Sequence, residues 1–124
     1  MKNLLTSLLV WAFLTGISAA NDVAPIGSVA APDVYKVIAE NDQFRVLRAT
    51  WQPGQEDSMH SHPGDRVSLF HNDCELHFTN ADGSTRVGKP RAGKARVRTS
   101  EAQHGHVAKN IGDSVCVITI VELK

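Results

Sequence analysis

After residue 32 the hydrophobic positions of this chain fall in short runs, some alternating with polar positions and some apolar on both faces. Clusters of Gly, Pro, Asn and Asp separate these runs at short intervals, and no stretch keeps the period of an amphipathic helix. Many short strands separated by turns are typical of a sandwich or a barrel, so the predicted fold class is all-β. The strands are expected at Val34–Ala39, Gln43–Trp51, Arg66–His71, Cys74–Thr79, Thr85–Lys89, Lys94–Thr99, Gln103–Lys109 and Ser114–Leu123.

Two segments predict how some of these strands are placed. Asn80–Ser84 contains the Asp-Gly pair that favours tight hairpins, so we expect Glu75–Thr79 to pair with Thr85–Lys89. The last run, Ser114–Leu123, is apolar on both faces, which predicts a strand inside a sheet.

The run Lys94–Thr99 alternates between small apolar and basic side chains. We expect Ala95 and Val97 to face the interior, because apolar side chains are usually the buried ones. The opposite face is then a solvated one rather than an anion site, and its residues are Lys94, Arg96 and Arg98.

The first twenty residues have a different pattern. Lys2 precedes an apolar run from Leu4 to Ile17, and Ser18–Ala19–Ala20 has the small side chains that signal peptidase requires. The apolar run is shorter than the roughly 20 residues of a membrane-spanning helix. Residues 1–20 therefore predict a signal peptide, and we expect a periplasmic or secreted protein with no membrane attachment after cleavage.

Composition limits the partners of the remaining chain. The 124 residues include 13 basic and 13 acidic side chains, with no basic stripe or aromatic-rich basic patch, so nucleic-acid binding is not expected. Residues 21–32 are rich in Ala, Pro, Gly and Ser and predict a flexible arm. Residues 33–124 are long enough for one domain with a single core.

Two histidine pairs carry the candidate chemistry. Gly54 opens a polar stretch that leads to His60 and His62, and in an extended segment these two side chains point the same way. Two imidazoles on one face are a ready pair of metal ligands. A second pair, His104 and His106, follows far along the chain. His71 and His77 are weaker candidates, because they fall at a turn and on a strand face.

These residues resemble the cupin superfamily. Gly54-x5-His60-x-His62 is similar to the first cupin motif, and His106-x3-Asn110 with the following Ile-Gly-Asp is similar to the end of the second. The resemblance covers residues 33–124. It implies a double-stranded β-helix, or jelly-roll barrel, with a divalent metal near one mouth, and it also implies a homodimer.

The chain departs from the cupin pattern at two places. Family members usually carry a glutamate ligand separated from the second histidine by three or four residues, where this chain has Arg66 and Val67. Counting from Gly93 places the second-motif histidine at His104, whereas counting back from Asn110 places it at His106. We prefer His106, because the sequence that follows it keeps the motif unbroken, and we retain His104 as its rival.

The predicted ligands are therefore His60, His62 and His106, or these three with His104. Imidazoles without a carboxylate suit a divalent transition metal, one of Fe, Zn, Ni, Cu or Mn, rather than Mg or Ca. Glu101 is a speculative source of the missing carboxylate. Arg66, if it points inward, is a candidate for binding an anionic ligand.

Three functions remain open. The first is a metal-binding cupin with an unknown small-molecule substrate, as a three-histidine non-haem metalloenzyme of dioxygenase or isomerase type. The second is a non-catalytic periplasmic cupin that binds a small ligand at a degenerate metal site. The third is a structural or dimer-forming barrel with a vestigial site, and the fold alone does not decide between them.

Two cysteines leave one further alternative open. Cys74 and Cys116 fall in predicted strands of an exported chain, where a disulfide is permitted. Buried free thiols are equally ordinary at such positions. The sequence favours neither state.

Overall fold

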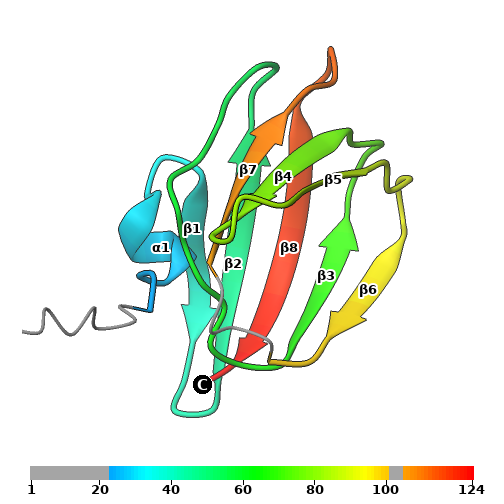
Figure 1. Cartoon of the computed structure of the whole chain (residues 1–124). Helices are drawn as coiled ribbons and strands as arrows, with labels where there is room; N and C mark the ends of the chain where they lie inside the picture. The colour runs from blue at the N-terminus through cyan, green and yellow to red at the C-terminus, as the bar shows by residue number, and fades with distance from the viewer. Residues whose placement is uncertain (1–22, 101–104) are drawn as a thin grey trace, which may run out of the picture.

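Two antiparallel sheets face each other in this protein (Figure 1). The computed structural model describes residues 23–100 and 105–124. It contains one short helix, α1, at Gly27–Ala30. The strands are β1 (Tyr35–Glu40), β2 (Phe44–Trp51), β3 (Arg66–Phe70), β4 (Leu76–Asn80), β5 (Thr85–Gly88), β6 (Ala95–Arg98), β7 (His106–Asn110) and β8 (Cys116–Leu123).

The larger sheet has the order β1-β2-β8-β3-β6, and the smaller has the order β5-β4-β7. β8 lies in the middle of the larger sheet, paired with β2 on one side and β3 on the other. This confirms the prediction of an interior strand. The smaller sheet contains the predicted hairpin, in which Thr79 pairs with Thr85 across the Asp-Gly turn.

The core lies between the two sheets and follows the alternation of the strands. Leu47, Ala49 and Trp51 of β2 are buried, and so are Ile118 and Ile120 of β8. Each large aliphatic side chain buried in this way stabilises the fold by about 1.5–3 kcal/mol.

The prediction for the faces of β6 is wrong. Val97 is 70% exposed and lies opposite Val67 on the outer surface, whereas Arg96 is half-buried and pairs with Ser68 on the inner face. β6 is an edge strand whose inner face borders a cavity rather than the closely packed core. Alternation shows which residues share a face, and here the basic residues occupy the inner one.

Part of the predicted N-terminal arm is packed against the barrel. Ile26 forms a parallel bridge with Ser61, and the Ser61 amide donates to the carbonyl of Pro25. Gly27, at the start of α1, lies against the ring of Tyr35. This segment therefore holds the stretch that contains His60 and His62 from outside.

A disulfide joins the two sheets, which answers the question that the sequence left open. Cys116 begins β8, and Cys74 lies just before β4, with a Cα–Cα distance of 5.1 Å. Asn72 adds a second link, because its side chain donates to the carbonyl of Val115 and accepts from the amide of Val117.

The predicted signal peptide, residues 1–20, lies outside the described residues. Among the residues that the structure does describe, no helix is long and apolar enough to span a bilayer.

Replacing both cysteines, in Cys74→Ala/Cys116→Ala, should lower the free energy of unfolding by about 2–5 kcal/mol, because the disulfide closes a long loop in the unfolded chain. Urea denaturation of the wild type under oxidising and reducing conditions, beside the variant, measures this. The reduced wild type should match the variant. Identical urea midpoints for all three would contradict the prediction.

Candidate metal centre

A pair of backbone hydrogen bonds brings His60 beside His106. The His60 amide donates to the carbonyl of His106 at 3.0 Å, and the His106 amide donates back at 2.9 Å. Directly opposed residues in such a pair project their side chains to the same face. The centroids of the two imidazole rings lie 4.5 Å apart.

Gly105 permits this close approach. A Cβ at this position would lie 2.9 Å from the carbonyl oxygen of His60 and 2.7 Å from the side chain of Ala24. Both contacts are closer than real Cβ atoms tolerate. The residue before His106 therefore has to be glycine for the two histidines to meet as they do.

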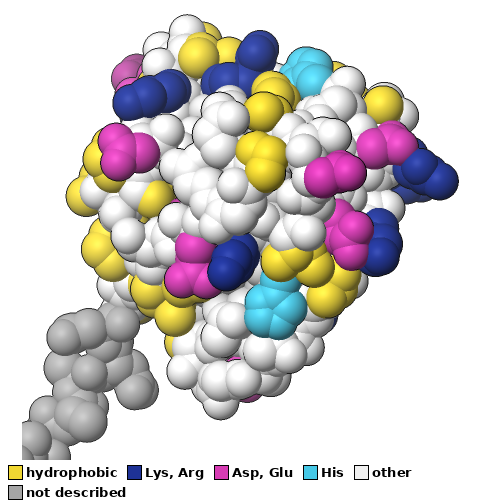
Figure 2. All heavy atoms as spheres, turned by 90° about the horizontal axis from the view of Figure 1, so that it is seen from above, with side chains coloured by type: hydrophobic (Ala, Val, Ile, Leu, Met, Phe, Trp, Pro, Cys, Tyr) yellow, Lys and Arg dark blue, Asp and Glu magenta, His cyan; other side chains and the backbone are white. Residues whose placement is uncertain are grey.

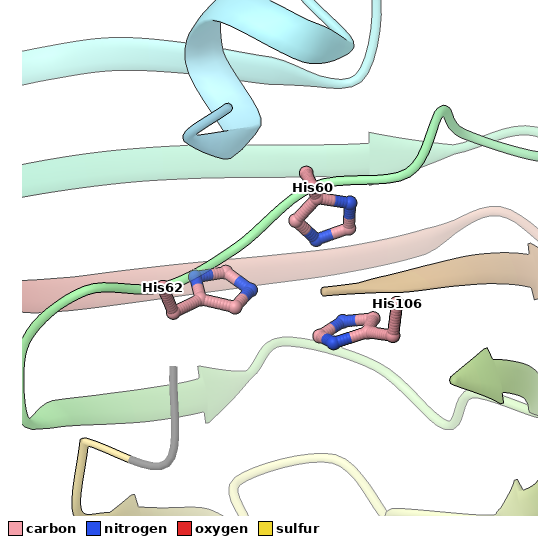
Figure 3. A group of neighbouring side chains, drawn as sticks. All are labelled: His60, His62 and His106. Atoms are coloured by element: carbon pink, nitrogen blue, oxygen red, sulfur yellow. The ribbon is translucent and has the colours of Figure 1, made fainter. Parts of the chain in front are cut away.

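His62 joins the same cluster from an extended loop. His60 and His62 are two residues apart, and both rings point toward His106 at the start of β7 (Figure 3). The centroid of the His62 ring lies 5.0 Å from that of the His60 ring and 5.4 Å from that of the His106 ring. The spacing prediction for His60 and His62 is thus confirmed, although the segment forms isolated bridges and not a regular strand.

One potential ligand atom from each of His60, His62 and His106 lies within 4.8 Å of the others. His104 and Glu101, the two other residues considered as ligands, lie outside the described residues. His71 and His77 are not members of the cluster. His71 instead hydrogen-bonds Thr119 at 2.7 Å.

The hydrogen bonds of His60 and His62 direct one nitrogen of each ring toward the cluster. His60 Nδ1 donates to the carbonyl of Ser58 at 2.9 Å, and His62 Nδ1 donates to Glu122 Oε1 at 2.5 Å. In a neutral imidazole the other nitrogen, Nε2, then carries the lone pair. A carboxylate behind a histidine in this way is the usual support of a metal ligand.

Tyr35 offers a direct test of whether a cation suits the site. Its hydroxyl lies 3.0 Å from Asp57 Oδ2 and 2.9 Å from His60 Nε2, and both are acceptors when His60 is neutral. The single hydroxyl proton cannot serve both. A cation at His60 Nε2 would leave the Tyr35 proton to Asp57, whereas without a cation a proton on Asp57, whose pKa is raised, would have to satisfy the same contacts.

Asp57 anchors this side of the centre. Its Oδ1 accepts from the amide of Ala108 at 2.7 Å, and its Oδ2 accepts from the indole of Trp51 at 3.3 Å. Burial raises the pKa of Asp57, and burial also raises the pKa of Tyr35 well above its ordinary value. The Tyr35 hydroxyl therefore keeps its proton at neutral pH.

Burial keeps His62 and His106 uncharged at neutral pH. It lowers the pKa of His62, and it lowers the pKa of His106 to about 2, with the nearby His60 contributing. Uncharged imidazole is the form that binds metal. The His106 ring has no hydrogen-bond partner among the described residues, so no hydrogen bond has to break before it binds a metal.

The donor set fits a divalent transition metal. Metal–nitrogen distances of about 2.0–2.1 Å require ligand atoms closer together than the 4.8 Å seen here, so small ring movements would complete the site. Three neutral imidazoles leave coordination positions open. The centre would be held by His60, His62 and His106, supported by Ser58 and Glu122.

Arg66 stands where the cupin pattern has a glutamate, and its side chain points inward. It lines the same cavity as His62 and His106 and is half-buried. It pairs across the sheet with Glu122, the residue that supports His62. The carboxylate near the proposed metal position is therefore Glu122 of β8, which hydrogen-bonds His62 and does not itself belong to the three-histidine cluster.

Sequence reasoning missed Glu122, Tyr35 and Asp57. For Glu122 a signal was present in the sequence, since it alternates with Ile118 and Ile120 on the same face of β8, the face that is buried in the structure, where Glu122 is 3% exposed. That signal was hidden because the other face of β8 is also apolar. Nothing local in the sequence marks Tyr35 or Asp57, which meet at the site through tertiary contacts.

No family model matches this chain, and no curated protein matches it in sequence. Solved structures do resemble it. A cupin domain from Bordetella pertussis is 22% identical, with a TM-score of 0.66 over 73% of this chain and 92% of its own. This chain has the cupin fold. An RmlC-like cupin with a double-stranded β-helix fold from Methanocaldococcus jannaschii is 11% identical, with a TM-score of 0.57 over 73% of this chain and 78% of its own.

A cupin superfamily protein from Desulfitobacterium hafniense gives a similar result, with 13% identity and a TM-score of 0.53 over 73% of this chain and 75% of its own. These likenesses confirm the predicted jelly-roll barrel. At such identities they establish the fold and leave the chemistry to the residues of this chain.

Replacing Glu122 with glutamine should weaken metal binding by about 10–100-fold, because the amide no longer holds the His62 Nδ1 proton as strongly. Titration of chelator-treated protein with Zn²⁺ or Ni²⁺, followed by calorimetry, measures the affinity. Glu56→Gln is a matched control, because Glu56 is outside the cluster. Equal affinities for wild type and Glu122→Gln would contradict a supporting role.

The metal-free protein should lose stability as pH falls from 7 to 5. His106 takes up its proton near pH 6.5 when unfolded but only near pH 2 when folded, so the unfolded chain binds more protons in this range. From His106 the loss amounts to about 2 kcal/mol. Urea denaturation at both pH values measures it. His106→Gln should show a shallower pH dependence, and an unchanged one would contradict the assignment.

Proposed function

We propose that this protein binds one divalent transition metal per chain through His60, His62 and His106 and presents it to a small molecule in the adjoining cavity. The observation that carries the proposal is the convergence of three histidine side chains from two separate segments, two of them with Nδ1 held by an acceptor. The competition for the Tyr35 proton supports a cation at the same place.

The chemistry that such a centre supplies is that of a metalloenzyme of dioxygenase or isomerase type. A transition metal with open positions polarises a bound oxygen atom or takes part in redox chemistry. The residues of the chain hold and orient it, and β2, β4 and β8 surround it with the apolar side chains of Trp51, Leu76 and Ile118.

A non-catalytic binding site is the second candidate, and one observation favours it. Among the described residues that line the cavity there is no aspartate or glutamate, and the buried Tyr35 keeps its proton. General acid–base catalysis usually needs a group whose pKa is near the working pH. Ligand binding without turnover, measured on the metal-loaded protein, would select this candidate.

We further propose that the protein acts outside the cytoplasm. The predicted signal peptide supports this, and so does the disulfide between Cys74 and Cys116, since disulfides persist in oxidising compartments.

The metal content of the purified mature protein tests the proposed centre. Elemental analysis should find one transition metal per chain in the wild type, after reconstitution where needed. His60→Ala/His62→Ala should contain less than a tenth of that amount, because a single remaining imidazole binds weakly.

His71→Ala/His77→Ala is the matched control, because it removes two histidines that lie outside the cluster. It should keep the wild-type metal content. Absence of metal from the reconstituted wild type, or equal retention by the His60→Ala/His62→Ala variant, would refute the proposed centre.

A further inference from the structure

Four arginines line the cavity beside the histidine cluster. Arg66 of β3 pairs with Arg98 of β6, and Arg96 of β6 is next to them on the same face. Arg86 of β5 belongs to the other sheet and lines the same cavity. Adjacent strands are about 4.8 Å apart, so Arg66 and Arg98 begin close together, and the charge of Arg98 acts on Arg86 as well.

This crowding has an electrostatic cost. Burial lowers the pKa of Arg66 and of Arg86, and in both cases Arg98 lowers it further. Glu122 offsets part of the lowering of the Arg66 pKa, but its carboxylate already accepts a hydrogen bond from His62. Among the described residues, no carboxylate forms an ion pair with any of the four arginines.

Elsewhere the charges of this protein are mixed. Figure 2 shows acidic and basic side chains lying next to one another on the face it presents. Two arginines outside the cavity form ion pairs, Arg45 with Glu40 and Arg91 with Asp73. Other basic residues, such as Arg48 and Lys36, also lack an ion pair among the described residues, but the cavity brings four unpaired arginines together beside the proposed metal.

Two of the guanidinium groups are held in place by aromatic rings. Arg86 Cζ lies 3.8 Å from the centroid of the Phe78 ring, and Arg96 Cζ lies 5.4 Å from that of Phe70. Stacking of this kind leaves the N–H groups at the edge of the guanidinium plane available to a ligand. Stacking also lowers the conformational entropy that the arginine side chains lose when an anion binds.

Most of the rest of the cavity wall is apolar, with Phe70, Phe78, Ile118 and Ile120 among its residues, and Ser68 and Tyr35 also line it. An inorganic anion would leave this wall in contact with water, whereas a hydrocarbon segment would cover it. The cavity volume is about 70 Å³, which limits the enclosed part of a ligand to a few non-hydrogen atoms. Arg98 is exposed and extends the positive charge to the cavity mouth.

We infer that the cavity binds a small organic dicarboxylate, with one carboxylate on the arginines, the carbon chain along the apolar wall and the other carboxylate toward the histidine cluster. Four guanidinium groups and a divalent metal carry more positive charge than one carboxylate balances. Arginine also matches the planar carboxylate with two parallel hydrogen bonds. This inference rests on the proposed function for the role of the second carboxylate, whereas the arginine end is independent of metal.

Calorimetric titration with succinate at fixed ionic strength tests the inference, on the metal-loaded protein and on the chelator-treated protein. Arg66→Gln/Arg98→Gln should bind succinate at least about tenfold more weakly in both forms, because charged hydrogen bonds are lost. Arg45→Gln/Arg91→Gln is the matched control, because both arginines lie outside the cavity. It should bind as the wild type does. Acetate, with one carboxylate, should bind more weakly than succinate.

Each other outcome is decisive. No binding of succinate by the wild type, or equal binding by Arg66→Gln/Arg98→Gln, would overturn the inference. Inorganic phosphate binding more tightly than succinate would overturn the dicarboxylate assignment. Arginine-dependent succinate binding by a wild type that takes up no metal would support the arginine end and refute the proposed metal centre.

Discussion

The reciprocal backbone hydrogen bonds between His60 and His106 are the constraint on which the site depends. They join a loop that follows β2 to the first residue of β7, and so they connect the two sheets at the place where the histidines meet. Gly105 makes the contact sterically feasible, and the bridge between Ile26 and Ser61 supports the loop from its other side. A displacement of this loop would move His60 and His62 together away from His106.

The charged groups of the interior are sorted into separate layers around that contact. Asp57 and Glu122 lie behind His60 and His62, where Asp57 accepts a hydrogen bond from the Tyr35 hydroxyl and Glu122 accepts one from His62. The arginines face the cavity, and the two layers meet at Arg66, the cross-strand neighbour of Glu122. The proposed anion and the proposed metal would therefore be held by neighbouring but distinct residues.

The sequence was sufficient for the all-β class and the hairpin at Asp82–Gly83, because strand-forming runs and turn residues control both. The sequence also placed His60 and His62 on one face by their spacing, whereas their meeting with His106 was expected from the resemblance to the cupin motifs, which left His104 as a rival. It was insufficient for Arg96, because alternation defines two faces and does not say which is interior when an edge strand borders a cavity. Glu122 was missed since both phases of β8 are apolar. The Cys74–Cys116 disulfide depended on a distance between sheets that local patterns do not contain.

The position of β8 also has a consequence for the order of folding. β8 pairs with β2, more than sixty residues earlier in the chain, and it supplies Glu122 to support His62. Sheets built from such distant partners form slowly, because loop-closure entropy is lost before the contacts are gained. The complete ligand set and its support come from residues 60, 62, 106 and 122, so no early local segment contains them. Capture of the proposed metal at full affinity would therefore be a late event, and it would report that the barrel has closed.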